Sequence, residues 1–335
     1  WRFGARLDLY GNCREKTMSK RGKTAIVAAG GNSLIVDDQH QSIHDQYKAA
    51  AQSSHYIADM VEAGVTVVLT HGNGPQVGFI LRRSGISKDL VPEVPVDYAD
   101  ADTQGAIGYM FQRSLYNEFK RRGLPRRVVT VVTQVAVDRN DPALASPSKP
   151  IGGYMDQQAA QKLASEFGWA VKEDAGRGWR RVVGSPKPKR IGELDTIKAL
   201  VDEGCIVIAC GGGGIPVVEN ADGTLDGLEA VIDKDFASAL LAHQLAADLF
   251  VLSTGVERVA VNFNRPDQRW LDRITLSEAK RYLAEGQFPS GSMGPKIEAI
   301  ASFLEAGGQR SAIITNPPNL GRALSGAAGT HIRPD

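Results

Sequence analysis

Short runs of consecutive apolar residues recur along this chain, and most are followed by a segment in which apolar residues return every three or four positions. The runs are typical of strands buried on both faces of a parallel sheet, and the longer period is typical of helices that cover such a sheet. The expected strands are 23–29, 65–70, 127–137, 206–209, 248–252 and, as the last one, 311–315. The expected helices are 46–63, 103–122, 156–167, 194–203, 234–242 and 297–306, with 91–102 as a loop and 258–263 as a hairpin-like extension. This order predicts an α/β fold.

Corners rich in glycine and asparagine follow several of these strands. Gly30, Gly31 and Asn32 follow the first strand, and the sequence THGNGPQVG (70–78) begins at the end of the second. Because parallel neighbours end at one edge of a sheet, the two corners together could form a divided anion site. Taken alone, the first corner is better explained as a tight turn. The glycines at 211–214 are stronger evidence, because flexible glycine is costly unless the backbone must approach something closely.

The stretch 231–242 carries a cation in an unusual place. Asp233 is a natural N-cap, so Lys234 and Asp235 fall in the first turn of the helix that follows. A cation there opposes the helix dipole, and a bound phosphate would offset it. The alternative is a lysine side chain that turns into solvent.

Composition and charge exclude several classes of protein. Lys and Arg number 39 against 38 Asp and Glu, so no overall field would attract nucleic acid or a membrane surface. No apolar run approaches 18 residues, and the first 22 residues have no signal-like apolar centre, so we expect no membrane association and a cytoplasmic location. Three cysteines without a CxxC spacing favour reduced thiols over a disulfide scaffold or a zinc site.

The histidines are weaker candidates. His71 ends the second strand, where a histidine is more often structural than catalytic. His40 and His44 have the spacing of a metal pair, but no third ligand is near in sequence, so no metal site is expected.

The region from about 138 to 186 differs from the rest of the chain in its density of proline, glycine and charge. This composition indicates a small subdomain that protrudes from the main sheet, plausible as a lid. Lys149, in a proline-bounded turn, is its best functional candidate.

Near the N-terminus, Met18 resembles a start just before the first strand. Residues 1–22 are therefore interpreted as an N-terminal arm or upstream segment, and 1–17 are left out of the fold.

Together the corners place glycines, three lysines and Asp235 at the carboxyl ends of strands. That combination favours phosphoryl transfer, in which a protein positions two anions and neutralises the charge on the moving group. The GxxxxGK[ST] loop, the HRD and DFG motifs and the GxGxxG fingerprint are all absent from the sequence.

From Lys23 to Arg333 the chain resembles the carbamate kinases of the amino acid kinase superfamily. The motifs that carry the resemblance occur in order: GGN (30–32), THGNGPQVG (70–78), TQGAIGY (103–109), VTQVAVD (132–138), KPIG (149–152), GWRRVV and SP (178–186), GGGGIPV (211–217), AVIDKD and ASA (230–239), and GSMGPK and EA (291–299).

The resemblance implies a three-layer α/β/α sandwich around an open, mainly parallel sheet of about eight strands. An N-terminal lobe (23–200), including the protruding subdomain, would bind the phosphoryl acceptor, and a C-terminal lobe (201–335) would bind the nucleotide. The implied reaction is reversible phosphoryl transfer between ATP and carbamate, giving ADP and carbamoyl phosphate, with Mg²⁺ on the nucleotide phosphates and a homodimer as the assembly.

The same resemblance assigns roles to individual residues. Lys149, Lys234, Asp235 and Lys296 would be catalytic. The acceptor and the transferring phosphoryl would lie on Gly30, Gly31, Asn32, Gly72, Asn73 and Gly74. The nucleotide would contact Gly212, Gly213, Lys234, Ser253, Gly255, Met293, Gly294 and Lys296.

Some positions depart from the commonest family pattern, among them Ala29, Asp102, 153–155 and 253–258. They lie beside the expected acceptor and base pockets, so they bear on which acceptor is used. The alternatives are a paralogue that phosphorylates another small carboxylate and a non-catalytic, nucleotide-binding regulatory protein.

Overall fold

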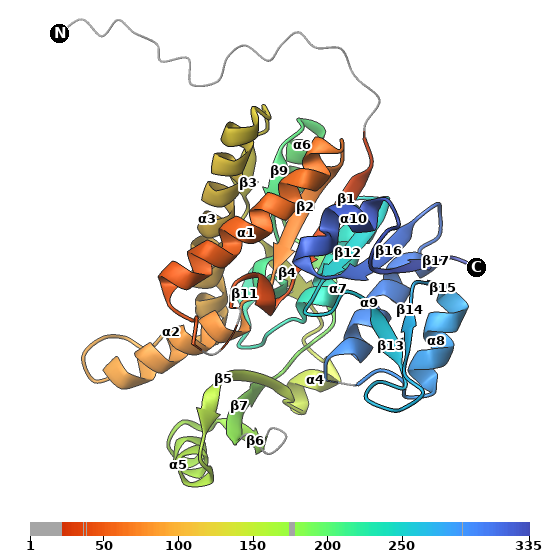
Figure 1. Cartoon of the computed structure of the whole chain (residues 1–335). Coiled ribbons are helices and arrows are strands. Elements are labelled where there is room, and N and C mark those ends of the chain that lie inside the picture. Colours follow the sequence, from red (N-terminus) through yellow and green to blue (C-terminus); the bar gives the residue numbers. More distant parts are fainter. Residues whose placement is uncertain (1–21, 36, 38, 174–177, 290) are drawn as a thin grey trace, which may run out of the picture.

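The computed structural model describes residues 22–335 except 36, 38, 174–177 and 290 (Figure 1). The interpretation of residues 1–17 therefore concerns a segment outside the described residues.

Within the described part of the chain, an open sheet of eight strands forms the middle of the molecule, and the fold class predicted from the sequence is confirmed (Figure 1). Neighbouring strands run parallel except β16 and β17. From one edge to the other, the order is β15 (Arg273–Thr275), β17 (Thr330–Arg333), β16 (Ser311–Thr315), β12 (Leu249–Ser253), β1 (Thr24–Ala29), β2 (Thr66–His71), β9 (Ile206–Ile208) and β3 (Val128–Thr130).

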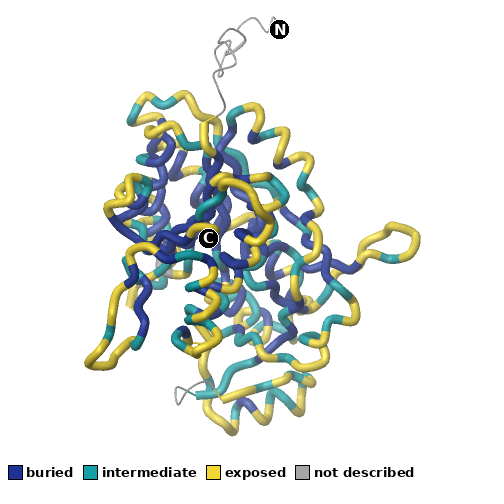
Figure 2. The backbone as a smooth tube through the Cα atoms, turned by 90° about the vertical axis from the view of Figure 1, so that its right-hand side faces the viewer, coloured by how far each residue is buried: buried dark blue, intermediate teal, exposed yellow. Residues whose placement is uncertain are grey.

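Helices cover both faces of this sheet, and β1 shows how one strand serves two cores. Val27 packs into the core under α1 (Ile43–Glu62), α3 (Val96–Arg122) and α10 (Leu320–Leu324). Ile26 points to the opposite core, because successive side chains of a strand alternate between faces. The helices on that side are α6 (Leu194–Asp202), α7 (Lys234–Gln244), α8 (Leu276–Ala284) and α9 (Met293–Glu305). Figure 2 shows the buried segments of the chain gathered inside an exposed outer shell.

Strand register brings the glycine corners together. In the parallel pair of β1 and β2, Ala29 lies opposite His71, and on the other side of β1 it lies opposite Ser253. The corners after these three strands therefore leave the sheet at the same edge, as the sequence predicts. The helix α2 (Gly74–Ser87) begins directly at the second corner, with a proline in its first turn.

The expected single strand over 127–137 is wrong. β3 ends at Thr130, and the chain re-enters a separate four-stranded sheet as β4 (Gln134–Val137). Thr133 lies at the break, where its N–H donates to the side chain of Gln104 (2.7 Å) and its hydroxyl donates to the carbonyl of Val131 (2.8 Å). The separate sheet also contains β10 (Ile215–Glu219), β11 (Leu225–Gly227) and β8 (Pro188–Ile191).

Two further boundaries differ from the sequence expectations. The loop expected at 91–102 is partly helical, because α3 begins at Val96 behind Pro95 and runs for 27 residues. The strand 311–315 is not the last one: the chain reverses through α10 and returns as β17, antiparallel to β16. With only four residues, β17 is too short to give a clear pattern in the sequence.

The hairpin-like extension is confirmed as β13 (Val259–Val261) and β14 (Arg269–Leu271).

The region between β4 and β8 projects away from the main sheet (Figure 1). It contains α4 (Pro142–Ala145), α5 (Gln157–Phe167) and a three-stranded sheet of β5 (Lys149–Met155), β7 (Trp179–Val183) and β6 (Ala170–Glu173). Lys149 is the first residue of β5, paired with Val183, so the expected turn at Lys149 is wrong.

The projecting sheet rests on α2 through a contact between two glycines. A Cβ on Gly78 would come within 2.5 Å of the Cα of Gly152, and Gly152 has a φ of +71°. A side chain at either position is therefore disfavoured. Lys88 in the loop after α2 adds an ion pair to Glu166 of α5 at 2.8 Å.

We predict that Gly78→Ala displaces β5. Alanine favours a helix by up to about 1 kcal/mol over glycine, but here its Cβ meets the backbone of Gly152, and overpacking of this kind costs about 1–3 kcal/mol. Amide hydrogen exchange should become faster in 149–155. Gly85→Ala is the matched control, since it lies in the same helix with open space around it. Unchanged exchange in 149–155 for both variants would contradict the prediction.

Candidate active site

The start of α7 is built as the sequence predicts. Asp233 is the N-cap, and its side chain accepts a hydrogen bond from the backbone N–H of Asp235 at 2.9 Å. Lys234 and Asp235 therefore occupy the first turn. The side chain of Lys234 is only 12% exposed, so the alternative of a lysine turned into solvent is wrong.

Asp235 lies between two lysines that come from different helices. Its Oδ1 is 2.9 Å from Lys234 Nζ, and its Oδ2 accepts a hydrogen bond from Lys296 Nζ at 2.6 Å. Lys296 belongs to the first turn of α9. Two helix starts thus bring two ammonium groups to one carboxylate.

Charge and burial act against each other in this cluster. Burial acts to raise the pKa of Asp235, but the charges of Lys234 and Lys296 outweigh it and hold that pKa well below its usual range. Burial lowers the pKa of Lys234, with Asp235 opposing it. The contact between Lys234 and Asp235 lacks hydrogen-bond geometry, and among the described residues Lys234 Nζ has no other hydrogen-bond acceptor. This ammonium group is therefore suited to an incoming anion.

Lys149 reaches the same helix start from the projecting sheet. Its Nζ donates to Asp233 Oδ2 at 2.6 Å, and its side chain is about one-third exposed. All three lysines named from the sequence therefore lie on the first turn of α7 or within reach of it.

The glycine corners adjoin the lysines. A Cβ on Gly72 would lie 3.9 Å from Lys234 Cδ and 4.0 Å from the backbone nitrogen of Gly31. Gly30 and Gly72 donate their own N–H groups within the protein, to the carbonyls of Ser253 and Ala29. The N–H groups left for a ligand are those that begin the short 3-10 helix η1 (Gly31–Ser33) and α2, since the first N–H groups of a helix have no acceptor inside it. They belong to Gly31, Asn32, Asn73, Gly74 and, because Pro75 has no N–H and Val77 already donates to Asn73, Gln76.

The run 211–214 approaches the protein itself. A Cβ on Gly211 would meet the ring of His71, one on Gly212 the side-chain amide of Asn73, one on Gly213 the carbonyl of Ile232, and one on Gly214 the side chain of Val135. Gly213 also donates its N–H to Cys210. The sequence predicts that the backbone of these glycines approaches another group closely. The structure confirms this, and the groups approached are parts of the protein. A nucleotide contact by Gly212 and Gly213 stays a prediction.

The remaining residues that are predicted to bind the nucleotide lie at the end of β12, in the loop after it and at the start of α9. Ser253 ends β12 opposite Thr315 of β16, and among the described residues the hydroxyls of both are buried without a hydrogen-bond partner. Gly255 follows in the next loop. Met293 and Gly294 begin α9, and Gly294 donates its N–H to Pro289. Sequence reasoning missed Thr315, whose position follows only from strand register.

Three residues of α3 behind the acceptor corner were also missed. Asp100 and Thr103 both accept hydrogen bonds from the amide of Asn73, at 2.8 and 2.9 Å. Gln104 donates to the carbonyls of Thr133 and Gly211. Burial raises the pKa of Asp100 to about 8. Asp100 falls in the segment expected to be a loop (91–102), so nothing in the sequence marked it as a buried acid of a helix.

His71 supports the structural interpretation. Its ring is buried, stacks on Phe111 with centroids 6.1 Å apart, and has a pKa lowered to about 4, chiefly by burial. The imidazole is therefore neutral at physiological pH, and it fills space beside Gly211.

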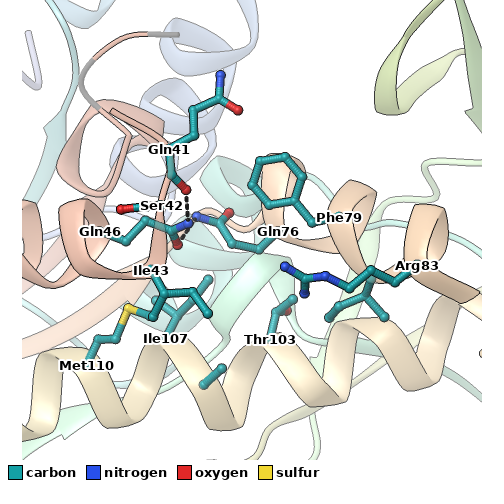
Figure 3. A pocket seen from close by; sticks show the side chains of 12 residues that line it. Gln41, Ser42, Ile43, Gln46, Gln76, Phe79, Arg83, Thr103, Ile107 and Met110 are labelled. Carbon is teal, nitrogen blue, oxygen red and sulfur yellow. Dashed lines mark hydrogen bonds between the residues drawn. The ribbon is translucent and has the colours of Figure 1, made fainter. Parts of the chain in front are cut away.

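A cavity of about 420 Å³ lies between the start of α1, α2 and α3 (Figure 3). The side-chain amides of Gln46 and Gln76 meet there at 3.0 Å, and the guanidinium of Arg83 turns toward it. Thr103 is the one member of the Asn73 network that lines it. The lysines lie elsewhere, so we place the candidate active site at the first turn of α7.

Residues 23–316 match the model of the amino acid kinase family. The chain belongs to the amino acid kinase family. This places the three lysines, the carboxylate and the glycine corners in a family of phosphotransferases, in agreement with the chemistry inferred from the motifs.

Individual relatives within the family are similar over nearly their whole length. A carbamate kinase of Thermococcus kodakarensis is 47% identical over 313 residues, which cover 92% of this chain and 99% of that protein. A carbamate kinase-like protein of Escherichia coli is 49% identical over 310 residues, covering 92% and 98%. The structure of carbamate kinase from Giardia lamblia bound to AMP-PNP superimposes with a TM-score of 0.88 at 40% identity, covering 94% and 99%.

Across the described residues of this amino acid kinase, no helix is both long and apolar enough to span a membrane.

Removing the carboxylate of Asp235 should destabilise this amino acid kinase. Asp235→Asn leaves two buried ammonium groups without their counter-ion, a change that costs about 3–5 kcal/mol. Because the pKa of Asp235 is lowered on folding, its contribution is present above its ordinary pKa of 3.8 and is lost as the pH falls below it. In urea unfolding, the difference in free energy between wild type and variant should therefore be largest near neutrality and shrink toward pH 3. A difference that stays constant or grows in acid would contradict this.

Proposed function

We propose that this amino acid kinase is a carbamate kinase, which transfers the γ-phosphoryl group of ATP to a carbamate oxygen and forms carbamoyl phosphate and ADP reversibly. The observation that carries the proposal is Asp235 between Lys234 and Lys296 at two helix starts, beside the glycine corners. The name of the Thermococcus kodakarensis relative, a carbamate kinase at 47% identity over almost the full length, supports it.

The site suits an in-line displacement between two anions. Lys234 and Lys296 would neutralise the charge that develops on the transferring phosphoryl group, and Asp235 holds both ammonium groups in place. Carbamate is already an anion with a nucleophilic oxygen, so no side chain has to remove a proton from it. A neutral, buried His71 is consistent with a reaction that needs no base.

The acceptor would lie on the N–H groups of Gly31, Asn32, Asn73 and Gly74, with Gly30 and Gly72 shaping the corners. Lys149 would approach the acceptor side from the projecting sheet, and its ion pair with Asp233 already fixes it within reach of the helix start. Closure of that sheet over the site would exclude water and protect an acyl phosphate from hydrolysis.

The nucleotide would occupy the other side of the lysines, along Ser253, Gly255, Met293 and Gly294, with Gly212 and Gly213 nearby. Among the described residues, no group of three or more His, Cys, Asp or Glu side chains is placed to hold a metal ion. We therefore infer that Mg²⁺ arrives as part of the MgATP substrate, bound by phosphate oxygens and water.

The same proposal includes an acceptor lobe (23–200), a nucleotide lobe (201–335), a cytoplasmic location and a homodimer. Large apolar side chains exposed along α3 are consistent with a surface between two subunits. They are Tyr98, Tyr109 and Tyr116.

Lys234→Ala and Lys296→Ala should each lower kcat by about 10² to 10³, since each removes one charge-stabilising donor. The assay is ATP formation from ADP and carbamoyl phosphate. Lys280→Ala is the control, because that lysine forms a surface ion pair with Glu305 on α9 and should leave kcat unchanged. Near-normal kcat in either site variant would overturn the assignment.

Two alternatives remain testable beside it. Ala29 and the segments 153–155 and 253–258 depart from the common pattern, so a paralogue acting on another small carboxylate would also fit the site. A coupled ATP assay with carbamate, acetate, glutamate and aspartate separates the acceptors, and we expect turnover with carbamate. Tight nucleotide binding without turnover of any acceptor would indicate a regulatory protein.

A further inference from the structure

Asn73 occupies a position from which it would normally cap its own helix. It is the N-cap residue of α2, and asparagine is among the strongest N-caps because its side-chain oxygen accepts from the first N–H groups of a helix. Here its side chain makes no capping hydrogen bond. The start of α2 is therefore left without the cap that its own sequence supplies.

Residues of α3 account for this. Asn73 Nδ2 donates to Asp100 Oδ1 at 2.8 Å and to Thr103 Oγ1 at 2.9 Å, so both amide hydrogens are engaged away from α2. The hydroxyl of Thr103 in turn donates to the carbonyl of Asp100 at 2.8 Å. On the opposite side, Gly212 packs against the same amide so closely that a Cβ there would overlap it. The side chain of Asn73 is thus held between α3 and the glycine run.

We propose that Asp100 is a positioning residue that draws Asn73 away from the start of α2 and so leaves the N–H of Gln76 free to join those of Asn73 and Gly74 on the anionic acceptor. The inference rests on the proposed function, because it assumes that the acceptor lies at this corner. Pro75, the second residue of α2, has no N–H, so a capping Asn73 would accept from Gln76 N–H. Without the hydrogen bond to Asp100, Asn73 turns to cap α2 and competes with the acceptor for that N–H.

The environment of Asp100 fits this role. Its side chain is buried, and its Oδ2 has no hydrogen-bond partner among the described residues. Burial raises the pKa of Asp100 to about 8, and the negative charge of Asp97 on the same helix acts in the same direction. From α2, the group that meets its carboxyl is the uncharged amide of Asn73. Near neutrality Asp100 is therefore an uncharged acid that can accept from Asn73 without placing a negative charge behind an anion site.

The test compares two substitutions at this position in the ADP and carbamoyl phosphate assay. Asp100→Leu keeps a branched side chain, although a larger one, and removes the acceptor, and we expect KM for carbamoyl phosphate to rise roughly five- to tenfold while KM for ADP stays constant. Asp100→Asn keeps an acceptor oxygen and should restore KM to within about twofold of wild type. Asn117→Leu, on the exposed face of the same helix and away from the acceptor corner, is the control and should change neither constant.

A double-mutant cycle separates positioning from general damage to the fold. In an Asn73→Ala background there is no side chain to cap α2, so Asp100→Leu should have no further effect on KM. A second readout is pH: KM of wild type should rise above pH 8 as Asp100 ionises, and KM of Asp100→Asn should stay flat relative to it.

The outcomes distinguish this inference from the proposed function. Absence of turnover in wild type with carbamoyl phosphate would overturn the proposed function. Normal wild-type turnover, with Asp100→Leu unchanged in KM or with ADP and carbamoyl phosphate affected equally, would overturn the positioning role alone. An equal effect of Asp100→Leu with and without Asn73 would do the same.

Discussion

The ammonium groups of Lys234 and Lys296 lie close together in a largely buried site, and this is possible only because the carboxylate of Asp235 lies between them. Asp235 is held there by the start of α7, Lys296 arrives on α9, and the two helices pack on the same face of the sheet. Removing water from charges is expensive, so a cluster of this kind persists where each charge has a partner. The cluster has a net positive charge, and that excess is what makes it a site for phosphate oxygens.

The rest of the site depends on where strands end. Parallel register aligns Ala29, His71 and Ser253, so the corners after β1, β2 and β12 share one edge with the start of α7. The corner at Gly72 then adjoins Lys234, since a Cβ on that glycine would lie 3.9 Å from Lys234 Cδ. The four glycines at 211–214 allow this crowding, because each would meet another part of the protein if it carried a Cβ.

Much of this was predictable from the sequence, and the exceptions share a cause. Strands buried on both faces give short, uninterrupted apolar runs, and glycine corners give clear local patterns, so the sheet and the three lysines could be named in advance. Thr133, Asp100 and Thr315 could not, because their roles depend on partners far along the chain. Thr133 lies at the break between β3 and β4, where its N–H donates to Gln104 of α3. The sequence drew attention to Asp102, which is exposed, whereas the acid that reaches Asn73 lies two residues earlier.

The place of β9 in the sheet affects how the molecule can be made. β9 comes from the second half of the chain and lies between β2 and β3, which come from the first half. Until residues 206–208 have left the ribosome, β3 has no neighbour in the sheet. The side of β2 that faces away from β1 has no hydrogen-bonding partner either. Each proposed lobe binds a different ligand, but we do not expect the lobes to fold independently. The sheet pairs segments that are far apart in the sequence, and such pairing slows folding. A chain that stops short of β9 would expose the unpaired edges of both strands, the kind of surface on which aggregation begins.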